Sequence, residues 1–290
     1  MTVAVWLAAA AAWWVIRGAI ARWREREFVR THEFGPDGVI VGAEPVTLTG
    51  TRPGAILLLH GYNDSPQSLQ FMAVALHAHG WTVRTPLLPG HGRRLQDWAA
   101  TGAAEWERAA RAELATLRQT HKDVAVGGLS MGGALAFMLA AEEPAVRAVI
   151  GFAPYLHASL SVELLQFLAP LASIGARYFA SGGAASVHDP VASEAMIAYR
   201  RSTPHLAVEL QKIVRVTRAG LHAVRQPVLV VQSREDNRIP AASAEEAFAM
   251  IGSTDKTLHW TTGNGHVVTV DYGHEAVEKL TAEWLESRLA

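Results

Sequence analysis

The sequence of 290 residues predicts a doubly wound, mostly parallel α/β sheet with helices on both faces. Apolar runs typical of strands alternate with amphipathic segments typical of helices, and the links between them are short. The run AILLLHG at 55–61 is apolar nearly throughout, as expected for a strand that is covered on both faces. Half of the residues are hydrophobic and only 18% are charged, which allows a sizeable core and argues against extended disorder.

Each element carries its own local signal. The helix at 63–80 can be capped by Asp64 or Ser65, with Pro66 in its first position and Gly80 at its end. Up to residue 154 the pattern predicts strands at 45–50, 55–61, 81–88, 123–130 and 146–154, and helices at 63–80, 102–121 and 131–143. After residue 226 it predicts strands at 227–233 and 256–262, and helices at 241–252 and 274–289.

The alternation is interrupted between Tyr155 and Gln226, where the apolar spacing is mostly helical. A helical insertion late in a parallel sheet predicts a lid over the carboxyl ends of the strands, where open α/β sheets bind ligands. We therefore divide the chain into an apolar N-terminal helix (1–30), the first part of the core (31–154), a helical lid (155–226) and the second part of the core (227–290).

Residues 1–30 differ from the rest of the chain. Residues 2–16 carry no charge, and five arginines and two glutamates follow them. Because the positive charge follows the apolar run, the pattern is not that of a secretory signal. Fifteen helical residues reach about 22 Å, short of the roughly 30 Å hydrocarbon core, so a span requires Arg17 to snorkel and residues 18–21 to join.

Two interpretations of this segment stay open. In the first, residues 1–30 contact a membrane, and the positive-inside rule places the body of the protein on the cytoplasmic side of the inner membrane. In the second, the segment is an apolar helix docked on the domain itself or on the second subunit of a homodimer.

Composition excludes several classes of protein. The formal net charge is −1 and the body contains no block of basic residues, so no nucleic-acid partner is predicted. The absence of cysteine excludes disulfides, thiol catalysis and cysteine-bound metals. The 13 histidines include no pair with H-x-x-x-H or H-E-x-x-H spacing. The sequence therefore predicts neither a metal nor a cofactor.

The segment AVGGLSMGGALAF (125–137) contains a G-x-S-x-G motif from Gly128 to Gly132, with Ser130 at its centre. A predicted strand precedes the motif and a predicted helix follows it. In that context the motif forms a sharp turn that exposes a nucleophilic serine, and Gly128 and Gly132 must be small to let the turn close. The alternative is an ordinary turn with a bystander serine.

A serine hydroxyl needs a base and a group that orients the base. In the strand–turn–helix arrangement these partners follow the serine in the order acid, then histidine. Asp236 lies just past a predicted strand and His266 lies in the loop after the last predicted strand, so we expect Asp236 to orient His266 and His266 to take the proton of Ser130. Glu235 competes with Asp236, whereas His259 within a strand and His274 at a helix start are expected to be structural.

Acyl transfer also needs hydrogen-bond donors for the developing oxyanion. The backbone N–H of Met131, at the start of the helix, is one expected donor. Tyr62, in the loop after the strand at 55–61, is the expected source of the second. We expect His60, Gly61 and His91 to support the site and not to act as bases, the alternative for His60-Gly61 being a simple turn of the chain.

The motifs LLLHGYNDSPQSLQ, PLLPGHG, GLSMGG, VVQSREDNRIP and GHVVTVD together resemble those of bacterial carboxylesterases and monoacylglycerol lipases with the α/β-hydrolase fold and a small helical lid. The resemblance runs from about residue 45 to the C-terminus. It implies Ser130 as nucleophile, Asp236 as acid, His266 as base, and Tyr62 and Met131 as oxyanion donors. The N-terminal helix is not part of the family pattern.

The sequence thus predicts a serine hydrolase that cleaves short-to-medium-chain carboxylic esters or monoacylglycerols through an acyl-enzyme on Ser130. An apolar lid segment indicates a hydrophobic acyl pocket and a small-molecule ester or lipid substrate. A C–C bond hydrolase or an acyltransferase would use the same machinery. A catalytically silent binding protein is a further alternative, because fold does not guarantee function.

Overall fold

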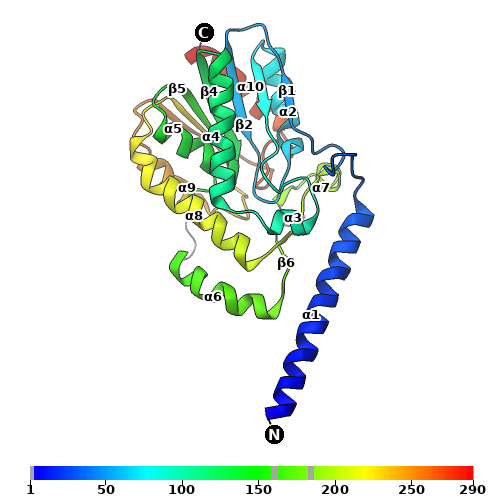
Figure 1. Cartoon of the computed structure of the whole chain (residues 1–290). Coiled ribbons are helices and arrows are strands. Elements are labelled where there is room, and N and C mark those ends of the chain that lie inside the picture. Colours follow the sequence, from blue (N-terminus) through cyan, green and yellow to red (C-terminus); the bar gives the residue numbers. More distant parts are fainter. Residues whose placement is uncertain (1–2, 158–161, 182–185, 290) are drawn as a thin grey trace.

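The computed structural model describes residues 3–157, 162–181 and 186–289 (Figure 1). Its main sheet has seven strands, β1 (Val46–Leu48), β2 (Gly54–Leu59), β3 (Thr82–Thr85), β4 (Asp123–Leu129), β5 (Val146–Phe152), β8 (Val228–Ser233) and β9 (Lys256–Thr261). They lie in the order β1-β3-β2-β4-β5-β8-β9, and only β1 pairs antiparallel with its neighbour. The prediction of a mostly parallel sheet is therefore confirmed.

Helices cover both faces of the sheet, as predicted. The helices α4 (Ala103–Thr120), α5 (Met131–Glu142), α8 (Pro204–Gly220) and α9 (Ala241–Met250) lie on one face, and α2 (Gln70–Ala78) and α10 (His274–Leu289) lie on the other. Along β2 the side chains alternate between the two cores: Leu57 and Leu59 face the first set of helices, and Ile56 and Leu58 face the second. Both sides of β2 are fully buried, which explains its apolar sequence.

Two details of the first half differ from the prediction. The helix expected at 63–80 begins with the 3-10 turn η1 (Pro66–Leu69), to which Ser65 is the N-cap, and only then continues as α2. The short helix α3 (Leu95–Ala99) was not predicted, because five residues are too few for a helical period to be recognised.

The segment expected to be a helical lid contains α6 (Val162–Gly175), α7 (Pro190–Ala195), α8 and η3 (Leu221–Ala223). It also contains an unpredicted two-stranded antiparallel sheet, β6 (Phe179–Ala180) with β7 (Arg201–Ser202). The helix α8 belongs to the core and not to a separate cap, since Leu206, Ile213 and Val214 are completely buried beside α5. Residues 158–161 and 182–185 of the predicted lid lie outside the described residues.

The N-terminal helix α1 (Val3–Thr31) projects from the body, and its N-terminus lies at the far end (Figure 1). Its apolar first half is exposed; Leu7 is 65% exposed and Trp14 is 56% exposed. Its last turns pack on the body, where Phe28 is 6% exposed and its ring stacks on Tyr199 at 5.4 Å. The helix is long and apolar enough to cross a membrane by length and composition. It runs past the boundary predicted at residue 30.

The helix α5 crosses the sheet at a very short distance. A Cβ atom built on Gly132 would lie 1.9 Å from the carbonyl oxygen of Leu59, and one built on Gly128 would lie 2.4 Å from the carbonyl carbon of Gly132. Such approaches are possible only without side chains. The two glycines therefore allow the turn between β4 and α5 to close against β2.

We expect Gly132→Ala to lower the free energy of unfolding by about 3 kcal/mol, because the added methyl group must displace α5 from β2. Gly175→Ala is the matched control, since nothing lies within 4 Å of a Cβ at that position. Urea denaturation of both variants measures the effect. Equal stability of the Gly132→Ala variant and the parent would contradict this account of the close approach.

Candidate active site

Ser130 lies in the sharp turn between β4 and α5. Its backbone has φ 53° and ψ −113°, a combination that non-glycine residues rarely adopt and that costs on the order of 1–3 kcal/mol. Its N–H donates to the carbonyl of Phe152 at 3.0 Å, which ties the turn to β5. Because β4 is central in the sheet, the turn holds Ser130 at the carboxyl edge of the strands, where it lines a cavity.

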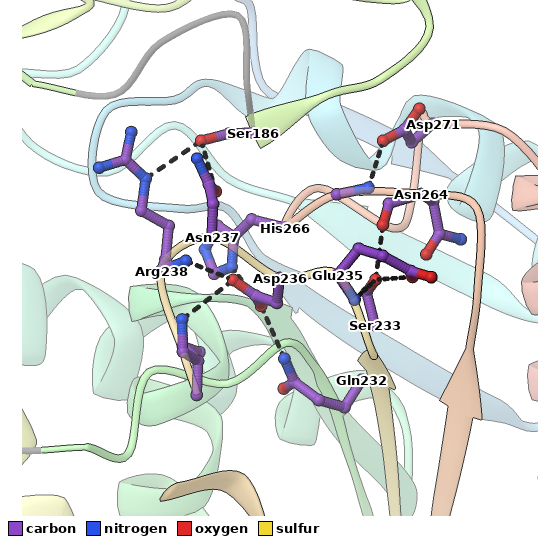
Figure 2. A network of polar contacts seen from close by, with 12 residues as sticks. Ser186, Gln232, Ser233, Glu235, Asp236, Asn237, Arg238, Asn264, His266 and Asp271 are labelled. Carbon is purple, nitrogen blue, oxygen red and sulfur yellow. Dashed lines mark hydrogen bonds and ion pairs between the residues drawn. The ribbon is translucent and has the colours of Figure 1, made fainter. Parts of the chain in front are cut away.

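Asp236 and His266 meet at the same edge of the sheet. Asp236 follows β8 and His266 follows β9, and Nδ1 of His266 lies 2.8 Å from Oδ2 of Asp236 (Figure 2). The carboxyl side chain is completely buried and the imidazole is 9% exposed. The hydrogen bond directs the Nδ1 proton toward Asp236 and leaves Nε2 as the acceptor. His266 lines the same cavity as Ser130.

Asp236 is held by three further hydrogen bonds. Oδ1 accepts from the N–H groups of Arg238 at 2.7 Å and Ile239 at 3.0 Å, and Oδ2 accepts from Nε2 of Gln232 at 2.6 Å. Burial by itself would raise the pKa of Asp236, but the hydrogen bonds and the charge of His266 outweigh burial and bring the pKa below its usual range. The carboxylate thus stays ionised and fixed beside the imidazole.

Glu235, the alternative acid, and the histidines His259 and His274 do not lie at this site. Glu235 turns away from His266 (Figure 2). Its carboxylate accepts from the N–H of Gly263 at 3.2 Å. His259 is exposed on β9, and His274 at the start of α10 binds Glu278. None of the three lines the cavity that contains Ser130.

Two backbone amides near Ser130 are free. Among the residues that the structure describes, no acceptor binds the N–H of Tyr62 or the N–H of Met131. Met131 opens α5, so its amide points along the positive end of the helix dipole. Tyr62 follows β2, the neighbour of β4, and its hydroxyl forms a 2.5 Å hydrogen bond with Ser202. Burial raises the pKa of the Tyr62 hydroxyl.

His60 and His91 hold the loop that carries Tyr62. Nδ1 of His60 donates to the carbonyl of Gly61 at 2.9 Å and Nε2 accepts from the N–H of Leu88. Nε2 of His91 donates to the carbonyl of Tyr62 at 2.8 Å. Burial lowers the pKa of His60 well below its usual value and lowers the pKa of His91 to about 4, so both rings are neutral.

Asp271 is a site residue that the sequence reasoning missed. It is fully buried, and its carboxylate accepts hydrogen bonds from the backbone amides of His188, Asp189, Gly265 and Tyr272. It therefore joins the loop of His266 to the lid segment before α7. The aspartate closes the quoted motif GHVVTVD, so its position in that motif was a signal that could have been used.

The cavity has a volume of about 350 Å³ and lies between the carboxyl edge of the sheet and the lid. Gly61, Tyr62, Ser130 and His266 line it at the sheet, and apolar side chains such as Leu165 line it at the lid. In the described ranges 3–157, 162–181 and 186–289, no three His, Cys, Asp or Glu side chains converge to hold a metal ion.

A family model described as serine aminopeptidase S33 matches residues 50–272. The chain belongs to this family. The chain is 29% identical over 248 residues to a thermostable monoacylglycerol lipase of Bacillus sp. strain H-257, covering 85% of this chain and 95% of the relative. It is 25% identical to a carboxylesterase of Bacillus subtilis, covering 85% of this chain and 98% of the relative.

Solved structures of lipolytic enzymes are similar to this chain along most of its length. A structure from a study of the metagenome-derived lipolytic enzymes LipS and LipT superposes with a TM-score of 0.77 at 29% identity, covering 88% of this chain and 100% of the other. The monoacylglycerol lipase of Paleococcus ferrophilus superposes with a TM-score of 0.72 at 19% identity, covering 84% and 98%. The fold is the α/β-hydrolase fold, as the resemblance implied.

Asp64 is a buried carboxyl beside the site whose ionisation the fold disfavours. Burial raises the pKa of Asp64 to about 6, although the Ser65 N–H at 3.1 Å and the charge of His266 act in the opposite direction. An acid whose folded pKa exceeds its unfolded value contributes stability that is lost as pH rises through the folded pKa. For Asp64, this loss of stability occurs between about pH 4 and about pH 6.

We expect Asp64→Asn, which keeps the oxygen that accepts from Ser65, to become more stable relative to the parent as pH rises through this window. Across this pH range the free energy of unfolding of the variant should rise by about 2–3 kcal/mol relative to that of the parent. Urea denaturation at pH 4, 5, 6 and 7 measures it, with Glu283→Gln, an exposed carboxyl on α10, as the control. A stability difference independent of pH would refute the raised pKa.

Proposed function

We propose that this protein hydrolyses carboxylic esters through an acyl-enzyme on Ser130. The Ser130 oxygen attacks the ester carbon while Nε2 of His266 takes its proton, and the same proton passes to the departing alcohol. Water then attacks the acyl group with His266 again acting as base, which releases the acid and restores Ser130. Asp236 orients the imidazole and stabilises its cation. The amides of Tyr62 and Met131 bind the oxyanion.

The observation that carries this proposal is the 2.8 Å contact between His266 and the buried, ionised Asp236. His266 and Ser130, whose backbone is strained, line the same cavity. Tyr62 lines the same cavity and Met131 directly follows Ser130, and among the described residues neither amide has an acceptor. The names of the relatives, a monoacylglycerol lipase and a carboxylesterase, support esters as substrates. Short-to-medium acyl chains and monoacylglycerols suit the apolar lining. A C–C hydrolase, an acyltransferase or a silent binder has no observation of its own in its favour.

The acid of the proposed mechanism is tested by replacing two neighbouring carboxyls. Asp236→Asn should lower kcat on p-nitrophenyl butyrate by roughly 10⁴, because the imidazole loses its orientation and its counter-charge. Glu235→Gln is the matched control and should stay within about threefold of the parent, because its carboxylate faces Gly263.

Ser130→Ala gives the baseline for both variants and should lower kcat by about 10⁶. Circular dichroism confirms that each variant is folded. The proposal fails if Ser130→Ala retains more than a few per cent of the parent rate. Loss of activity in Glu235→Gln together with retention in Asp236→Asn would instead assign the acid to Glu235.

We propose also that residues 1–30 contact the cytoplasmic face of a membrane. The support is the exposed apolar first half of α1 and the arginines that follow it, beginning at Arg17. Apolar side chains lower their free energy by leaving water, and arginines at the end of the apolar run suit anionic headgroups. The homodimer is the competing explanation, since a second copy could cover the same side chains.

Flotation with vesicles of phosphatidylcholine and phosphatidylglycerol separates these explanations. The full chain should float, and the double variant Leu7→Glu/Trp14→Glu should remain at the bottom of the gradient. Val74→Glu on α2 removes an equally exposed apolar side chain, 61% exposed, from the body and should float normally. If no flotation occurs and light scattering gives twice the chain mass, the dimer replaces the membrane.

A further inference from the structure

Two arginines lie at the opening of the cavity that contains Ser130. Arg200 directly precedes β7 and Arg238 lies in the loop after β8, and both line this cavity. Both residues are also exposed to solvent. A residue that is exposed and also lines a cavity lies where the cavity meets water, so a dissolved ligand can reach both arginines.

Neither guanidinium pairs with a carboxylate among the described residues. Nη2 of Arg200 donates to the carbonyl of Ser193 at 2.5 Å. Nε of Arg238 donates to the hydroxyl of Ser186 at 3.1 Å (Figure 2). Both serines line the cavity as well, so they hold the arginines against its wall. A guanidinium has five N–H donors, and most donors of each arginine therefore stay available to a ligand.

The backbone of Arg200 is strained. Its φ is 50°, in the left-handed region that residues with a Cβ atom rarely adopt. Strained conformations of this kind are concentrated at functional sites, because the surrounding structure must hold them in place. Here the preceding residue, Tyr199, donates its N–H to the carbonyl of Asn63 at 3.0 Å. Arg200 is thus fixed next to the loop that carries Tyr62, the proposed oxyanion donor.

Arg238 is joined in a similar way to the loop of the proposed base. Its backbone N–H donates to the carboxylate of Asp236 at 2.7 Å. Ser186, which binds the Arg238 side chain, accepts at its carbonyl from the N–H of Val267 at 3.0 Å, and Val267 directly follows His266. One positive charge is therefore tied to the oxyanion loop and the other to the loop of the base.

The cavity wall holds no accessible negative charge to balance these arginines in the part of the chain that the structure describes. Asp64 is the one acidic residue among the described lining residues; it is 7% exposed, and it accepts from the N–H of Ser65. Much of the remaining lining is apolar, as at Leu165 and Leu210. Charges of one sign beside apolar walls concentrate the field in a cleft and attract ions of the opposite sign.

We infer that Arg200 and Arg238 bind an anionic group on the alcohol part of the ester substrate. A guanidinium can donate two parallel hydrogen bonds to such a group. The apolar part of the cavity suits the acyl chain, because burying a charge there without a partner is costly. The alcohol leaves while the acyl group stays on Ser130, so the alcohol belongs at the opening. Both arginines determine specificity in this account, which rests on the proposed ester hydrolysis.

Three esters of matched size test the inference. Butyl butanoate is the neutral reference, 4-(butanoyloxy)butanoate carries a carboxylate at the end of the alcohol, and monobutyl succinate carries one at the end of the acyl chain. The anion preference is kcat/KM for a charged ester divided by kcat/KM for butyl butanoate. We expect it to exceed one for 4-(butanoyloxy)butanoate and to lie below one for monobutyl succinate.

The double variant Arg200→Gln/Arg238→Gln should lower the preference for 4-(butanoyloxy)butanoate about tenfold, as expected for the loss of two exposed ion pairs. Raising NaCl from about 20 mM to about 500 mM should lower this preference in the parent and not in the double variant, because salt screens exposed charges. Circular dichroism confirms folding, and Arg200→Met/Arg238→Met provides a second test should the glutamine variant unfold.

The matched control removes two positive charges outside the cavity. Arg234 lies four residues before Arg238, with its guanidinium over the ring of Trp260, and Lys279 is exposed on α10. Neither residue lines the cavity. Arg234→Gln/Lys279→Gln should therefore keep the anion preference of the parent to within about twofold, since charges in water beyond a Debye length are largely screened.

Three outcomes overturn the inference. The first is an anion preference that is the same in the parent and in both double variants at Arg200 and Arg238. The second is an equal loss of preference in the control, which would assign the effect to the overall charge of the protein. The third is a preference for monobutyl succinate instead, which would place the anion on the acyl side. Failure of the underlying mechanism is distinguishable, because the parent would then hydrolyse none of the three esters.

Discussion

The close approach of α5 to β2 is the constraint on which the rest of the site depends. With no side chain at Gly128 and Gly132, the backbone of α5 can reach the carbonyl of Leu59. The chain must then turn within one residue, and Ser130 takes the strained conformation of that turn. The same turn leaves the amide of Met131 without an intrahelical acceptor. Exposure of the hydroxyl and a free donor beside it are therefore two results of one packing contact.

A second constraint fixes the position of His266, the proposed base. His266 lies on a loop, and loops position side chains well only when their backbone is itself fixed. Asp271 supplies that restraint, with four backbone amides on one buried carboxylate. Two of those amides belong to the lid segment at 188–189, so the loop of His266 and the lid segment are held by the same side chain. Movement of this lid segment would break hydrogen bonds to the carboxylate that also holds the loop of His266.

The sequence could predict those parts of the molecule whose signal is local. The apolar run of β2 indicates a strand buried on both faces, and the glycines around Ser130 indicate a tight turn. The order of Ser130, Asp236 and His266 along the chain follows from the topology of the sheet. It could not reveal that α8 belongs to the core, because an amphipathic period is the same on a cap helix and on a core helix. The β6–β7 pair depends on neighbours that are far away in the chain, which no local period encodes.

The N-terminal helix α1 forms polar contacts with the lid segment. Nε1 of Trp13 donates to the carbonyl of Ile174 at the end of α6, at 2.7 Å, and Arg24 donates to the carbonyl of Tyr178 just before β6. Farther along, Glu27 pairs with Arg201 on β7. The helix that we propose for membrane contact is thus bonded to the lid segment at three points: the end of α6, the residue before β6, and β7. A surface that held α1 would therefore hold the lid segment with it. If α1 contacts a membrane as proposed, the same helix would both hold the protein at that surface and position the lid.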